Sequence, residues 1–477
     1  MSPVPIFRRG AELARLLGEV ADVDWRNPLW WALVGSAAAA EPLGASADAY
    51  LSSDAEPSAD TFMAFPSPPA RDAAAAIADA IALARAAVVA LRAIDGELPE
   101  QPLARTIERT EAGARAIACD ELEQVAFVAG ERAYLAHLGD DHTLAIELAR
   151  ALRGEPCALV AIDPDGPPAP AAIAAIIGDE PIATARHAHR RAWSRRGGPW
   201  LGVARAGDHA IVSTCHLIVD GYGHAWIASR IARALGARRD LARAAASIVD
   251  GAPGPVLTAP QGAEPLGIAW RRVDRSIRFP ELAHALGRVL HDDARLPHAR
   301  CSPTFQVPVA PGAADDVARW RRRVVPALLS VRFSDGSPEP LEIFAERARD
   351  AIAREASGVG LMARLAAAAR AVPAPLAWKR RAVGGSARPS LFAPAARVLG
   401  GRACLSILRA GPELDGAPPL AAASSAALPA SRRDPHGSCV LTVIDDAGGA
   451  VITASGSGAT GTAGGAADLL DRWLAIV

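Results

Sequence analysis

Apolar and polar positions change in pattern along the chain. Residues 8–20 and 71–94 carry apolar side chains at helical spacing, and residues 40–70 are rich in Ala, Ser, Asp and Pro. Apolar residues that recur every three to four positions favour an amphipathic helix, whereas clusters of Ser, Asp and Pro favour loops. We therefore predict that residues 1–115 form an added, mainly helical region with an irregular stretch over 40–70.

Three tryptophans, Trp25, Trp30 and Trp31, lie in this first region. One interpretation makes them anchors that dock the region onto the rest of the protein. The other makes them an interfacial contact with a membrane or a substrate, because tryptophan suits the boundary between water and lipid. Both interpretations remain open at this point.

From about residue 116 short apolar runs alternate with helical patterns, which is typical of α/β proteins. We expect a first unit over 116–250, a Pro-, Gly- and Arg-rich crossover linker over 251–300, and a second unit over 301–477. The expected strands are 124–138 (one or two), 157–162, 181–188, 200–204, 210–214, 304–309, 324–333, 402–408, 438–444 and 450–455. The expected helices are one that starts at 140, 141 or 142 and runs to 152, one over 170–177, one over 227–235, one or two over 341–371, and a terminal helix through Trp473.

Composition excludes several classes of protein. The chain has 477 residues, of which 51% are apolar, and its net charge is −1. This length gives room for two or three domains. Because there is no basic surplus and no basic-aromatic cluster, we predict no nucleic-acid partner.

The six cysteines are scattered and form no Cys-x-x-Cys pair, so we predict neither a metal site nor a disulfide framework. We find no run of about 18 uncharged apolar residues and no secretory signal. We therefore expect no transmembrane segment and a cytoplasmic location.

The strongest chemical signal is the stretch His216-Leu-Ile-Val-Asp220-Gly221. It follows the predicted strand 210–214 and precedes a helix with Ile227 and Ile231 on its apolar face. A histidine at a strand end can meet a substrate in a cleft, and a carboxylate four residues on can brace the turn. Glycine permits backbone conformations that a side chain would resist.

This His-x-x-x-Asp-Gly pattern resembles the signature of the CoA-dependent acyltransferase superfamily, which includes chloramphenicol acetyltransferase, condensation domains and wax ester synthases. The resemblance implies that His216 is the general base and that Asp220 is structural, paired with an arginine, beside Gly221. Many members carry a second His or an Asp just before the motif histidine, where this chain has Cys215. The plant-type Asp-Phe-Gly-Trp-Gly pattern is absent, which argues against that branch.

The resemblance also implies an architecture. It predicts an α/β (α+β) fold with two chloramphenicol-acetyltransferase-like subdomains in a pseudo-twofold arrangement, and His216 at the tunnel between them. Ser406, on a predicted strand of the second unit, lies where the trimeric members of the family place a serine that stabilises the oxyanion.

The implied function is acyl transfer from a thioester, either acyl-CoA or an acyl group on a carrier protein, to a small alcohol or amine in secondary metabolism. No bound cofactor or metal is implied. The alternatives are a free-standing condensation-like enzyme that forms amides and a non-catalytic binding or scaffold protein that keeps the fold. A covalent acyl intermediate on Cys215 is a further alternative.

Two other patterns have less chemical content. His187, His189 and Arg190 form a basic run without a neighbouring carboxylate or cysteine at metal spacing, and we interpret it as a solvated face. Residues 455–465 are glycine-rich and precede a helix, but lack the lysine of a phosphate-binding loop. A flexible turn is the favoured interpretation.

Overall fold

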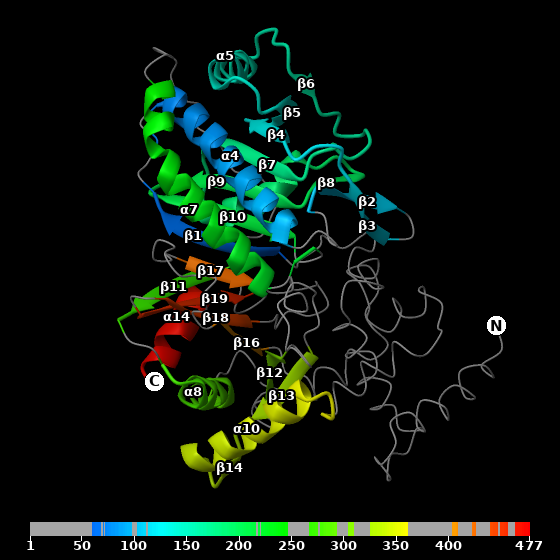
Figure 1. Cartoon of the computed structure of the whole chain (residues 1–477). Helices are drawn as coiled ribbons and strands as arrows, with labels where there is room; N and C mark the ends of the chain where they lie inside the picture. The colour runs from blue at the N-terminus through cyan, green and yellow to red at the C-terminus, as the bar shows by residue number, and fades with distance from the viewer. Residues whose placement is uncertain are drawn as a thin grey trace, which may run out of the picture.

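The computed structural model is an α/β protein built on two large sheets, one above the other in Figure 1. It describes residues 60–67, 70, 72–97, 103–110, 113–215, 218–219, 221–246, 267–274, 277–292, 304–309, 325–360, 403–408, 422–425, 439–446, 449–456 and 463–477. The α/β class predicted from the sequence is confirmed. The helix expected over 8–20 and the three tryptophans near it lie outside the described residues.

The first sheet has eight strands, of which seven come from the first half of the chain. In spatial order they are β17 (Ala422–Ser425), β1 (Asp60–Pro66), β10 (His209–Cys215), β9 (Leu201–Ala206), β7 (Ile173–Asp179), β4 (Gln124–Ala129), β5 (Arg132–His137) and β6 (Val160–Ala161). Strands β9, β7 and β4 run parallel to one another, and the neighbours on either side are antiparallel. The central strands are mostly apolar and almost entirely buried, as expected for a sheet covered on both faces.

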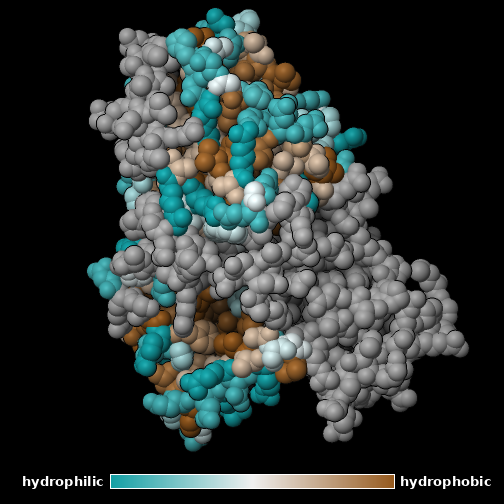
Figure 2. All heavy atoms as spheres, viewed as in Figure 1, coloured by the Kyte–Doolittle hydropathy of each residue, from teal (hydrophilic) through white to brown (hydrophobic). Residues whose placement is uncertain are grey.

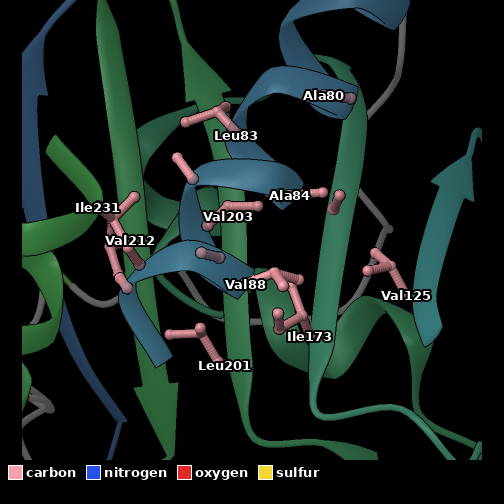
Figure 3. Packing of buried hydrophobic residues seen from close by; sticks show 14 of the residues in the cluster. Ala80, Leu83, Ala84, Val88, Val125, Ile173, Leu201, Val203, Val212 and Ile231 are labelled. Atoms are coloured by element: carbon pink, nitrogen blue, oxygen red, sulfur yellow. The ribbon is translucent and has the colours of Figure 1, made fainter. Parts of the chain in front are cut away.

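Helix α4 (Ala73–Glu97) lies across one face of this sheet beside α7 (Gly221–Ala246) and α5 (Asp141–Leu152). Asp72 caps its start, since the Asp72 carboxylate accepts a hydrogen bond from the Ala75 N–H at 2.7 Å. Small alanines let the helix approach the sheet and α7 closely. Leu83 and Val88 of the helix belong to the same buried apolar cluster as Val203 of the sheet, seen from close by in Figure 3. Each fully buried leucine of this kind contributes about 1.5–3 kcal/mol.

Among the described residues, α4 alone has the length and apolar composition needed to cross a membrane. However, 72% of its most apolar window is buried within the structure. Its apolar faces pack on the sheet and on α7, so its composition is that of a core helix.

The other face of the first sheet is covered by α6 (Ile182–Ala185) and the 3-10 helix η1 (Ala188–Ala192). A small side sheet follows the order β3 (Gly113–Ala118), β2 (Arg105–Thr110) and β8 (Gly197–Pro199). It projects from the edge of the first half in Figure 1.

The second sheet contains β11 (Gly267–Val273), β19 (Gly449–Gly456), β18 (Cys439–Asp446), β16 (Ala403–Leu408), β12 (Thr304–Val309) and β13 (Val325–Ser330), in that order. Helices α8 (Phe279–Asp292), α10 (Leu341–Ala356) and α14 (Ala463–Leu474) pack around it, and β14 (Phe333–Ser334) pairs with β15 (Ser337–Pro338). Hydrophilic residues lie on the outside of both halves in Figure 2, as helices with one buried face require.

The two large sheets share one topology. The run β1-β10-β9-β7-β4-β5 in the first matches β11-β19-β18-β16-β12-β13 in the second, pair by pair and with the same strand directions. The intervening helices also correspond, with α4, α5 and α7 matched by α8, α10 and α14. The fold is therefore an internal duplication in topology; a twofold axis between the halves stays a prediction.

Strand β17 joins the two halves. It lies between β16 and β18 in sequence, but it pairs antiparallel with β1 at the edge of the first sheet, with Met63 opposite Ala423. Ile444 and Val451 of the second sheet also belong to the main apolar cluster of the first half. The halves therefore share both a sheet and a core.

A buried arginine fastens the β9–β10 hairpin to β1 and α4. The Arg205 guanidinium donates to the Ser67 hydroxyl at 2.9 Å and to the Gly207 carbonyl at 3.1 Å. It also lies 3.2 Å from the Asp79 carboxylate of α4 and 3.7 Å from that of Asp179. The end of the hairpin opposite the motif is thus held by several charge-assisted contacts.

Several predicted elements are wrong. Residues 60–66, expected to be irregular, form β1 inside the sheet, so β1 and α4 belong structurally to the first half rather than to an added region. The expected linker contains β11 and α8. The helix expected over 170–177 is strand β7, and the strand expected over 181–188 is α6 and the start of η1.

Two further predicted elements are only partly correct. The stretch 157–162 yields only the exposed two-residue strand β6. Of the one or two helices expected over 341–371, one is α10, which ends at Ala356, and residues 361–371 lie outside the described residues. The strands expected over 304–309, 402–408, 438–444 and 450–455 are confirmed to within a few residues, as are the helices near 71–94 and 142–152.

Candidate functional site at the β10–α7 junction

The strand and the helix that flank the predicted motif are both present. Strand β10 is buried along nearly its whole length, and α7 begins at Gly221. The Cys215 N–H donates to the Trp200 carbonyl at 2.8 Å, and the Ile218 N–H donates back to the Cys215 carbonyl at 3.1 Å. Val219, two residues before the start of the helix, is buried. The strand and the helix predicted on either side of the motif are confirmed.

The predicted site residues stand differently in the structure. His216 and Asp220 lie outside the described residues, and Gly221 is the first residue of α7. Ser406 lies on β16, opposite Thr442 of β18, and is half-buried. The roles proposed for these four residues stay predictions.

A buried hydrogen bond spans the base of the junction. Thr214 is the last residue but one of β10, and its hydroxyl lies 2.7 Å from Nδ1 of His224 in the first turn of α7. Both residues are 0% exposed. Which of the two groups donates depends on the tautomer of the imidazole.

This pair is not among the predicted site residues, although the sequence contains a signal for it. His224 precedes Ile227, Ala228 and Ile231 by three, four and seven positions, which is the spacing of one helical face. A histidine on that apolar face, ten positions after a strand-end threonine, predicts a buried polar contact, because buried polar groups are almost always hydrogen-bonded.

A second buried pair lies on the other face of β10. The Ser213 hydroxyl is 3.1 Å from Nδ1 of His189 in η1, and both residues are buried. The His189 ring meets the Trp193 ring edge-on, with the ring centroids 5.8 Å apart. The interpretation of residues 187–190 as a solvated basic face is therefore wrong for His189, which fixes η1 against the sheet.

Gly202 explains how η1 comes so close. A Cβ at this position would collide with the His189 backbone nitrogen and would lie 2.7 Å from both the Ala188 carbonyl carbon and the Ser213 hydroxyl. Only glycine leaves room for the backbone of η1 at this point of β9.

Cys215 is fully buried in the main apolar cluster. Its burial agrees with a packing role beside the motif, because an acylated thiol needs access to the donor. None of the five described cysteines forms a disulfide. Among the residues that the structure places, no three His, Cys, Asp or Glu side chains gather as metal ligands would.

No protein-family model matches the chain, and no curated protein matches it. Solved structures do. A solved structure from work on condensation domain-mediated chain release from the enacyloxin polyketide synthase is 15% identical, with 87% of this chain and 77% of that chain covered and a TM-score of 0.37. This chain is similar to condensation domains.

Two other structures give comparable figures. The condensation domain of the monacolin K polyketide synthase MokA is 14% identical over 87% of this chain and 91% of that chain, with a TM-score of 0.40. TRI101 of F. sporotrichioides, complexed with coenzyme A and T-2, is 10% identical over 90% and 96%, with a TM-score of 0.40. Condensation domains are among the groups named by the sequence resemblance.

Proposed function

We propose that this protein is an acyltransferase that moves an acyl group from a thioester to an alcohol or amine, with His216 as the general base. One observation carries the proposal. The motif His216-x-x-x-Asp220-Gly221 falls between a buried strand and a helix that begins at its glycine, which is the setting this motif requires.

The chemistry needs one positioned base. His216 takes the proton from the acceptor hydroxyl or amine as that atom attacks the thioester carbonyl. A new C–O or C–N bond forms, the C–S bond breaks, and the proton passes to the leaving thiolate. Imidazole suits this role because its ordinary pKa lies near neutrality, and a positioned base contributes about 10²–10⁴ in rate. Ser406 is proposed to face the developing oxyanion from the second half.

The proposed co-substrate is an acyl-CoA or an acyl group on a carrier protein, and the acceptor is a small molecule. We propose that the chain works in the cytoplasm and holds no resident cofactor. Asp220 is proposed to pair with an arginine and hold the loop, so Asp220→Ala should lower both the melting temperature and the activity. A variant that melts like the parent contradicts this role.

Thiol release tests the proposal. The parent protein is mixed with a panel of acyl-CoAs and acyl-carrier proteins and with alcohol and amine acceptors, and the free thiol and the product are measured. His216→Ala should lose at least about 10²-fold in kcat with little change in the donor KM, because the base acts in the transition state. His142→Ala, which removes an exposed histidine of α5, is the matched control and should retain activity.

The outcomes separate the candidate functions. Product formed from carrier-bound substrates alone, as an amide, indicates the condensation-like enzyme. An active His216→Ala protein overturns the proposal, and a parent inactive on the whole panel favours the scaffold alternative. Cys215→Ser should stay active; loss of activity together with an acylated protein by intact mass would support the covalent Cys215 route instead.

A further inference from the structure

We propose that Thr214 and His224 are a positioning pair, which closes the base of the motif turn and thereby holds the proposed catalytic base in place. This inference rests on the proposed function and deepens it. It assigns a role to two residues outside His-x-x-x-Asp-Gly, neither of which is proposed to touch the substrate.

The geometry supports a firm closure. Thr214 and His224 bracket residues 215–223, and their side-chain atoms are 2.7 Å apart with both residues 0% exposed. A hydrogen bond out of reach of water is electrostatically strong, and loss of one partner leaves the other buried with that bond unmade. The bond therefore fixes the first turn of α7 to the end of β10.

Comparison with the second half shows that this pair is not needed to build the fold. In both hairpins the turn has two residues, since the last strand residues to pair are Ala206 with His209 in the first half and Asp446 with Gly449 in the second. Counting from these pairs, Thr214 corresponds to Ala454, which has no hydroxyl. The same hairpin followed by a helix thus forms in the second half without this hydrogen bond.

The neighbouring Ser213–His189 pair provides a matched comparison within β10. It also joins a hydroxyl of β10 to an imidazole, and Ser213 is the neighbour of Thr214, but it connects the strand to η1 rather than to α7. Losing it should loosen the packing of η1 without reaching the motif turn. Losing the Thr214–His224 bond should loosen the turn itself, where small misplacements of reacting groups can cost about 10²-fold in rate.

The experiment compares three threonine and serine variants. Thr214→Val keeps the shape and removes the hydroxyl, Thr214→Ser keeps the hydroxyl, and Ser213→Ala removes the neighbouring one. We expect Thr214→Val to lose about 10- to 100-fold in kcat with the donor KM within about two-fold of the parent. Thr214→Ser should keep most of the activity, and Ser213→Ala should match the parent in kcat even if its melting temperature falls.

Hydrogen exchange provides a readout that does not depend on activity. Amides in peptides covering residues 215–223 should exchange faster in Thr214→Val than in the parent and in Ser213→Ala. If the parent shows no acyl transfer, the proposed function fails, and this exchange difference still decides whether the pair closes the turn. If Thr214→Val does not fold, His224→Leu and His224→Asn replace it, since asparagine restores a polar group near the Nδ1 position.

Two results would overturn the inference. One is a Thr214→Val protein with parental kcat and parental exchange over 215–223. The other is an equal loss of kcat in Ser213→Ala, which would reduce the effect to a general loss of stability.

Discussion

The two halves of the molecule have the same strand order, yet they differ at the positions of the proposed site and its supports. Counted from the hairpin turns, His216 corresponds to Gly456, Thr214 to Ala454 and Gly202 to Thr442. The apolar residues that build the sheets recur in both halves, as Leu201 and Leu441 show, and both are 0% exposed. Topology is therefore encoded by the repeated apolar pattern, whereas the candidate site is added to one copy.

The difference at Gly202 gives the largest expected effect on stability. Gly202→Thr installs the residue that the second half carries at the same position, and its Cβ would collide with the η1 backbone. Backbone cannot move aside as a side chain can, so we expect a loss of about 3 kcal/mol or more. Chemical denaturation measures it.

Gly139→Ala is the control for Gly202→Thr, since nothing lies within 4 Å of a Cβ placed there. It should unfold like the parent. If Gly202→Thr also unfolded like the parent, the two halves would not differ in how closely their sheets are covered at this position.

The hairpins differ in charge as well, because Arg205 corresponds to Asp445. Arg205→Met keeps the length of the side chain but leaves Asp79 and Asp179 without their buried partner. Both carboxylates keep some contact with water, so we expect a loss of about 2–3 kcal/mol, less than for a fully buried pair. Arg153→Met, at an exposed ion pair with Glu155, should cost far less.

Proline scanning of β17 tests how tightly the halves are joined. In an antiparallel pair alternate residues donate to the neighbouring strand, so Ala423→Pro and Ser424→Pro differ in whether a bond to β1 is lost. We expect the more harmful of the two to lose about 2 kcal/mol. The thermal transition should shift as a whole; an unchanged second-half transition beside a lowered first-half one would mean independent halves.

The smallest expected effect is a pH dependence of the melting temperature that arises from Glu180 in the first half. Burial raises the pKa of Glu180, against the opposing attraction of Arg191 at 3.2 Å. Because the pKa is higher in the folded state, ionisation of Glu180 lowers the free energy of unfolding. This loss is absent below the unfolded pKa near 4.5, where the carboxyl is protonated in both states, and it is present at neutral pH. The melting temperature of Glu180→Gln relative to the parent should therefore rise between pH 4 and pH 7. If this relative melting temperature fell over the same range, the pKa of Glu180 would be lowered on folding rather than raised.

The sequence predicted the fold best where the local pattern and the tertiary environment agree. Strands β16, β18 and β19 and helices α4 and α5 have strong periodicity and were placed to within a few residues. Strand β7 was mistaken for a helix because Ile173-Ala-Ala-Ile-Ile is buried on both faces and shows no alternation. Strand β1 was missed because Pro66 and the Ser- and Pro-rich flanks indicated a loop, although proline is tolerated at the end of a strand.

The candidate site was predictable in part. The motif and its strand–turn–helix setting follow from residues close together in sequence. The partners of β10 do not, because His189 and Trp200 reach it through tertiary contacts. The burial of His189 in particular follows from Gly202 on another strand, which no pattern around residue 189 reveals.

Strand β17 has a consequence for the order in which the protein is made. Met63 pairs with Ala423, which is synthesised 360 residues later (423 minus 63). During synthesis the first sheet can form its β1–β10 ladder but keeps an open edge at β1 until most of the second half has left the ribosome. Unpaired edges invite pairing with other chains, so a nascent chain stopped before residue 422 should be prone to aggregation.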